Sequence, residues 1–116
     1  NIGKLYSHGQ ESRKLELTKS QVQNAQEIFL FNNRLQATEE HHAIRRYKEL
    51  MKEDHKIIAL RTAVRESAEA KLEHGIIDVN NLLQEIIKEN EAKTNLSTHE
   101  IEMLKHIYEL KHTVNQ

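Results

Sequence analysis

The stretch LEHGIIDVNNLL, residues 72–83, decides how this chain folds. A glycine just past a helix end can adopt the left-handed conformation that satisfies the last carbonyl groups, and Gly75 is placed to do so. Asp78 can begin a new helix, because its carboxylate can accept hydrogen bonds from the first backbone N–H groups. The stretch therefore predicts a tight helix–helix turn at 75–78.

Outside this turn almost nothing interrupts a helix, since the chain has no proline and only three glycines. We predict a first helix over 10–74 and a second over 79–115. Two of the glycines fall in 1–9, which we expect to be a short irregular lead-in. The predicted fold class is all-α: a long antiparallel helical hairpin, or coiled coil, in one domain. Ser97 and Glu100 have capping-box spacing, which leaves a break in the second helix open.

Apolar residues recur every seven positions in the first helix, which favours left-handed supercoiling against partner helices. Two adjacent rows form one broad stripe: Leu15, Val22, Phe29, Ala43, Leu50, Ile57 and Val64, beside Leu30, Ala37, Ile44, Met51, Ile58 and Leu72. Folding the chain about the turn brings this stripe onto the apolar residues of the second helix. The predicted pairs are Leu72–Leu82, Ala68–Ile86, Ile57–Leu96, Leu50–Met103 and Ala43–Leu110.

The two predicted helices differ in length, at roughly 95 and 57 Å for a rise of about 1.5 Å per residue. Residues 10–37 are therefore expected to have no partner within this chain. This overhang carries large apolar side chains, and such a stretch marks an interface. We expect helix packing through Val22, Ile28, Phe29, Phe31 and Leu35.

Composition excludes several classes of protein. The 17 basic and 18 acidic residues balance, so the chain lacks the basic stripe of a nucleic-acid-binding protein and the polybasic anchor of a membrane-surface protein. Its longest apolar run, residues 28–31, is far short of a membrane span. The chain begins at Asn1 without methionine, so we interpret it as a segment of a longer protein.

The pattern Arg61-x3-Arg65-x2-Ala68-x3-Leu72-x2-Gly75-x3-Val79-x2-Leu82-Leu83 resembles the TolC outer-membrane channel family. Further similarities are Ala92 after Asn90, the Tyr108 region, and 27–32, which looks like channels of Bacteroides-type bacteria. The lead-in resembles the end of a barrel strand.

The resemblance implies a periplasmic segment of a Gram-negative outer-membrane export channel. Three chains would form one tube, whose helical tunnel domain meets a periplasmic adaptor protein and an inner-membrane pump. Membrane contact would come only through a barrel outside this chain, with no nucleic acid, no cofactor and no enzymatic activity. The alternative is a structural coiled-coil spacer or interaction hairpin without channel activity.

The resemblance also implies that the turn is the periplasmic tip, where the channel narrows and contacts its adaptor. The expected tip residues are Leu72, Gly75, Ile76, Ile77, Asp78, Asn81, Gln84 and Glu85. Better-known drug-efflux members carry tyrosine, arginine and two aspartates where Leu72, Ile77, Asn81 and Gln84 stand. A charged gate of that kind is therefore not expected. We expect the turn to expose Ile76 and Ile77, although these could instead pack back onto the hairpin.

Eight histidines raise the question of a metal site. Glu39-x2-His42 and Glu109-x2-His112 have the spacing of di-iron bundle ligands, but the further inward glutamates of such sites are missing. We therefore expect solvated helix faces and no catalytic or metal residue. For Arg61 and Arg65 we expect side-chain stems that cover apolar surface and guanidinium groups that reach Glu85 or Glu89.

Overall fold

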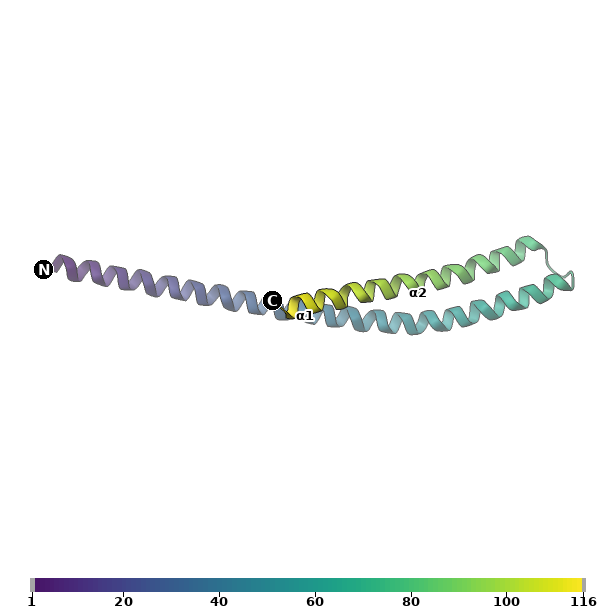
Figure 1. Ribbon diagram of the computed structural model, residues 1–116, viewed down its shortest axis with the longest axis horizontal. Coiled ribbons are helices and arrows are strands. Elements are labelled where there is room, and N and C mark those ends of the chain that lie inside the picture. Colours follow the sequence, from purple (N-terminus) through teal and green to yellow (C-terminus); the bar gives the residue numbers. More distant parts are fainter. Residues whose placement is uncertain (1, 116) are drawn as a thin grey trace. The chain divides into compact units, whose positions relative to one another are not determined.

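The chain folds into two helices that form an antiparallel hairpin. In the computed structural model, which describes residues 2–115, α1 spans Ile2–Glu73 and α2 spans Val79–Val114. The chain divides into two compact units, one up to Thr38 and one from Glu39 onward. Within the second unit, α2 runs back along α1 from the turn (Figure 1). The predicted all-α hairpin is confirmed.

The turn between the helices has the hydrogen bonds of a Schellman motif. Gly75 has a φ of 71° and donates its N–H to the carbonyl of Leu72 at 3.0 Å. The Ile76 N–H reaches back to the carbonyl of Lys71 at 2.8 Å, so the last carbonyls of α1 are satisfied. Asp78 then caps α2, its carboxylate accepting the Asn81 N–H at 2.9 Å. The sequence predicted both roles correctly.

The helix bounds correct one expectation and decide one alternative that the sequence left open. The irregular lead-in is wrong for residues 2–9, because α1 already begins at Ile2; Asn1 lies outside the described residues. A glycine costs only about 1 kcal/mol inside a helix, and without proline two glycines do not stop it. Nor does α2 break near Ser97, whose capping-box spacing remains inside a continuous helix.

The seam, our name for the interface between α1 and α2, is only partly apolar. Its half-buried apolar residues include Ala43, Ile44, Met51, Ile58 and Leu72 on α1, with Leu82, Ile86, Leu96, Met103, Ile107 and Leu110 on α2. Within 2–115 the fully buried residues are small or polar: Asp54, Ala68, Glu89, Ala92 and Thr113. The hairpin is therefore held by a thin apolar row beside a polar one, a composition that the heptad pattern did not predict.

One of the two predicted apolar rows lies largely outside the seam. Leu50, Ile57 and Val64 remain 37–46% exposed, so each leaves a large part of its apolar surface uncovered by α2. The Tyr47 ring instead lies between His99 and His106, at 5.9 and 5.6 Å. The predicted register nevertheless agrees with the cross-seam contacts Asp54–His99 and Arg65–Glu89. Three residues farther along α1 and three back along α2, these contacts lead to the predicted pairs Ile57–Leu96 and Ala68–Ile86.

Candidate functional site

The predicted tip residues occupy three different environments. Ile76 is the most exposed of the apolar ones, with 70% of its surface accessible, while Leu72 and Ile77 are half-buried. The turn therefore exposes Ile76 as expected but not Ile77, which packs back onto the hairpin. Gly75 and Asp78 fix the backbone at the turn.

The remaining tip residues line a groove beside the turn. It has a volume of about 570 Å³, and its polar lining includes Asn81, Gln84 and Glu85 from α2. Its apolar lining includes Ile77, and α1 contributes Ser67. The structure thus brings four of the predicted tip residues together on one concave surface.

Glu85 is the groove residue with an unmatched polar atom. One of its carboxylate oxygens lies 3.6 Å from Lys88 Nζ. The other, Oε2, is inaccessible and has no hydrogen-bond partner. A buried acceptor without a donor is unfavourable, and because Oε2 is inaccessible, a donor could reach it only if the Glu85 side chain moved.

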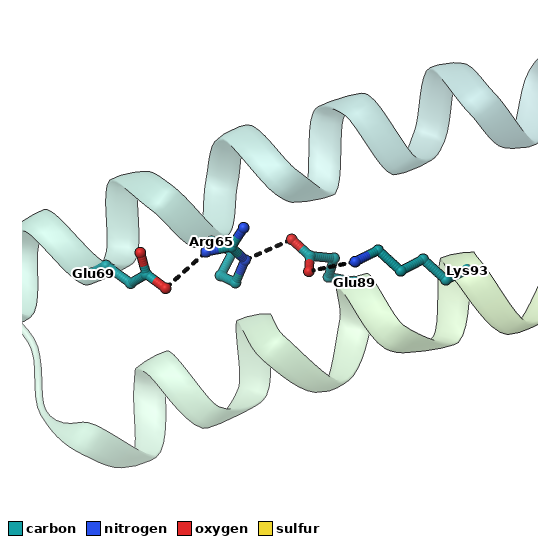
Figure 2. Close-up of polar contacts among 4 residues, drawn as sticks. All are labelled: Arg65, Glu69, Glu89 and Lys93. Carbon is teal, nitrogen blue, oxygen red and sulfur yellow. Dashed lines mark hydrogen bonds and ion pairs between the residues drawn. The ribbon is translucent and has the colours of Figure 1, made fainter.

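A four-residue ion network crosses the seam one turn farther from the tip. Arg65 donates from Nε to Glu89 at 2.6 Å across the seam and from Nη1 to Glu69 at 2.7 Å along α1. Lys93 adds a contact to Glu89 at 3.1 Å (Figure 2). The prediction that Arg65 reaches Glu89 is confirmed.

Charge in this network shifts two pKa values in opposite directions. The hydrogen bonds that Arg65 donates to Glu89 and, with a smaller effect, to Glu69 raise the pKa of Arg65. The hydrogen bond from Arg65, helped by Lys93, lowers the pKa of Glu89 against the opposing effect of burial. Both groups are therefore held in their charged forms. Glu89 is only 5% exposed, and a carboxylate so nearly buried needs a cationic partner to remain charged.

The other half of the seam carries a cluster that sequence analysis missed. His106 Nδ1 lies 2.5 Å from Glu40 Oε2, and His99 Nδ1 lies 2.5 Å from Asp54 Oδ2. The Tyr47 ring lies between the two imidazoles, stacked on His106 with an interplanar angle of 23°. We call these five residues the histidine ladder. Seven-residue spacing on both helices was the signal that could have revealed it.

The overhang residues are exposed, each with about half or more of its surface accessible. They are Val22, Ile28, Phe29, Phe31 and Leu35. In the unit up to Thr38, the described side chains are exposed apart from Asn33 and Ala37, which are half-buried. The expectation of a large apolar surface here is confirmed, while its partner stays a prediction.

Two features of the described residues bear on chemistry. No three His, Cys, Asp or Glu side chains in 2–115 are arranged to hold a metal ion. Among these residues no helix combines the length and the apolar character that crossing a bilayer requires. No protein-family model, curated protein or solved structure matches the chain.

Proposed function

We propose that this chain is a periplasmic tunnel segment of a trimeric outer-membrane export channel. One observation carries the proposal: each helix has apolar residues that its partner in the hairpin leaves uncovered. On α1 these include Leu50, Ile57 and Val64, and on α2 they include Ile101 and Leu104. A helix in a tunnel wall has neighbours on both sides, so it needs apolar surface on more than one face.

The tip geometry supports the same proposal. Ile76 gains nothing from exposure to water, and the groove beside the turn is lined by polar and apolar residues of both helices. An exposed apolar side chain near a concave surface favours contact with another protein. In a channel that contact would be the periplasmic adaptor, which in turn would meet an inner-membrane pump.

The exposed apolar residues of the overhang also support the proposal. Phe29 and Phe31 each bury large apolar areas when covered, and aromatic side chains dominate interface energetics. In the proposed tube, neighbouring helices of the same trimer would cover them. The second candidate, an interaction hairpin or spacer without a channel, needs the same covered surfaces but no outer membrane and no trimer.

Cell fractionation separates the two candidates. Antibodies against this hairpin should detect the full-length protein in the outer-membrane fraction, with trimers after brief chemical crosslinking of intact cells. A known inner-membrane protein serves as the fractionation control. Recovery in a soluble fraction, or as a species other than a trimer, would contradict the channel and favour the spacer.

Ile76→Asp in the full-length protein tests the tip. The side chain is exposed, so the change should leave folding, membrane insertion and trimer formation intact while reducing adaptor crosslinking and export. His74→Asp is a matched control, an exposed position in the same turn. Normal adaptor binding and export by the Ile76→Asp protein would show that Ile76 does not contact an adaptor.

A further inference from the structure

The C-terminal half of α2 has two faces that could pack on α1. The face in the seam alternates apolar and polar residues, with Met103 half-buried between two histidines of the ladder. The opposite face carries Ile101, Leu104 and Tyr108, spaced three and four residues apart and each more than half exposed. That spacing is the pattern of an apolar helix stripe.

Hydrophobic burial alone does not explain why the face with the histidines turns inward. Ile101, Leu104 and Tyr108 offer an apolar surface comparable to that of Met103, Ile107 and Leu110, which are half-buried. The inward face in addition brings the polar rings of His99 and His106 into the seam. Burying a polar group is unfavourable unless it is hydrogen-bonded. Some interaction specific to the observed arrangement must therefore offset the apolar surface left in water.

The histidine ladder supplies that interaction. Asp54 is 7% exposed, and its Oδ2 is 2.5 Å from the His99 ring. A carboxylate can only accept, so the ring nitrogen is the donor. At the other end Glu40, with 15% of its side chain exposed, is paired in the same way with His106. Rotating α2 would remove both donors and leave two carboxylates poorly solvated.

Sliding α2 by one heptad also disrupts the ladder. In one direction Ala92 would replace His99 and offer Asp54 no donor, while His99 would replace His106 beside Glu40. In the other direction His106 would meet Asp54, but Thr113 would replace it beside Glu40 and His99 would move next to Arg61. Each slide therefore keeps one histidine–carboxylate pair and loses the other. Tyr47 keeps the central position only in the observed register, where both rings flank it.

We propose that the histidine ladder selects which face and which register of α2 pack on α1, and so keeps the apolar face of Ile101, Leu104 and Tyr108 directed outward. Polar groups in coiled-coil seams are known to specify register at some cost in stability. The ladder acts in this way over the half of the seam far from the turn, where the Gly75 motif no longer constrains α2. The inference rests on the seam geometry and does not require a channel.

The test reverses the charges of the ladder in the dilute, purified chain. A nitroxide label is placed at exposed position 104, or at half-buried position 110 as its matched control, and its mobility is measured by electron paramagnetic resonance. In the parent protein the label at 104 should be mobile and the label at 110 restricted. Glu40→Lys with Asp54→Lys sets cations against both histidines and should abolish this contrast, whether α2 rotates, slides or detaches.

Adding His99→Glu and His106→Glu to that variant restores opposite charges across the seam. The mobility contrast between 104 and 110 should then recover to near the parent value. An unchanged contrast in the Lys variant would overturn the proposal, because α2 would have kept its face without the ladder. A contrast lost in the Lys variant and not recovered in the four-residue variant would overturn it too, since the pairing would then not be the cause.

Discussion

The two halves of the seam are held by different chemistry. Near the turn, Arg65 joins Glu89 across the helices and is supported by Glu69 on its own helix. Far from the turn, two histidines bind carboxylates and flank Tyr47. The half near the turn depends on the guanidinium group of Arg65, which is always charged. The half far from the turn depends on the imidazole groups of His99 and His106, a side-chain type that can be neutral or charged.

This difference indicates how each half should fail. Glu89 depends on one cross-seam cation, so removing that cation leaves a nearly buried charge. The ladder spreads its hydrogen bonds over two pairs separated by an aromatic ring, so one pair can be lost while the other remains. The half near the turn should therefore be more sensitive to a single substitution.

Arg65→Leu is the largest expected perturbation. It leaves the Glu89 carboxylate in the seam with only Lys93, and breaking a buried pair costs more than the pair contributes. Thermal unfolding by circular dichroism should show the greatest loss of melting temperature among the variants considered. Arg65→Leu with Glu89→Leu should recover most of that loss, and Glu69→Ala should have a small effect. If the double variant were no more stable than Arg65→Leu, an orphaned charge could not be the reason.

His99→Leu should have the next largest effect. It removes the donor to Asp54 and leaves that buried carboxylate unpaired, at a cost of about 1–3 kcal/mol. Chemical denaturation monitored by circular dichroism at 222 nm measures this loss of stability. His106→Leu should cost less, because Glu40 is more exposed than Asp54 and can be solvated. A reversed order would mean that burial of the carboxylate does not set the size of the effect.

Gly75→Ala tests whether the half near the turn also depends on the backbone. At this positive φ a residue with a β-carbon is less stable than glycine by about 1–2 kcal/mol. No atom lies within 4 Å of the added carbon, so the expected cost is conformational and not steric. Gly75→Asn is the matched comparison and should cost less, since asparagine tolerates this conformation better. Equal losses for both variants, measured by denaturation, would point to a steric rather than a conformational cause.

Acid titration should show the smallest difference in stability between a variant and the parent protein. Arg65 lowers the pKa of Glu89 from 4.5. The pair therefore stabilises the folded state at pH values above the pKa that Glu89 has in the unfolded chain. That stability is lost as the pH falls from about 4.5 through the lower folded pKa. Melting temperatures from pH 7 to pH 2 should therefore decline less steeply below pH 4.5 for Glu89→Gln than for the parent. Parallel profiles would show that Glu89 contributes nothing to the acid sensitivity.

Local sequence signals were enough for the turn and poor for the seam. Gly75 and Asp78 act through backbone conformation and hydrogen bonds within a few residues, so their roles could be predicted without the partner helix. The groove beside the turn could not, because it depends on how Ser67 and Gln84 are brought together by the pairing. The lead-in was mispredicted for a related reason: two glycines were given more weight than the helical context on both sides.

The sequence by itself determined that this chain is helical, where it reverses and that it leaves apolar surface uncovered, because propensity, capping and periodicity are properties of neighbouring residues. Tertiary structure decided which polar pairs form in the seam and which apolar residues stay outside it. Apolar residues lie on several faces of both helices, and more than one face would bury some of them. Which carboxylate meets which donor depends on residues 24 or 45 positions apart in sequence, and the antiparallel contact of the helices places Arg65 against Glu89 and His99 against Asp54.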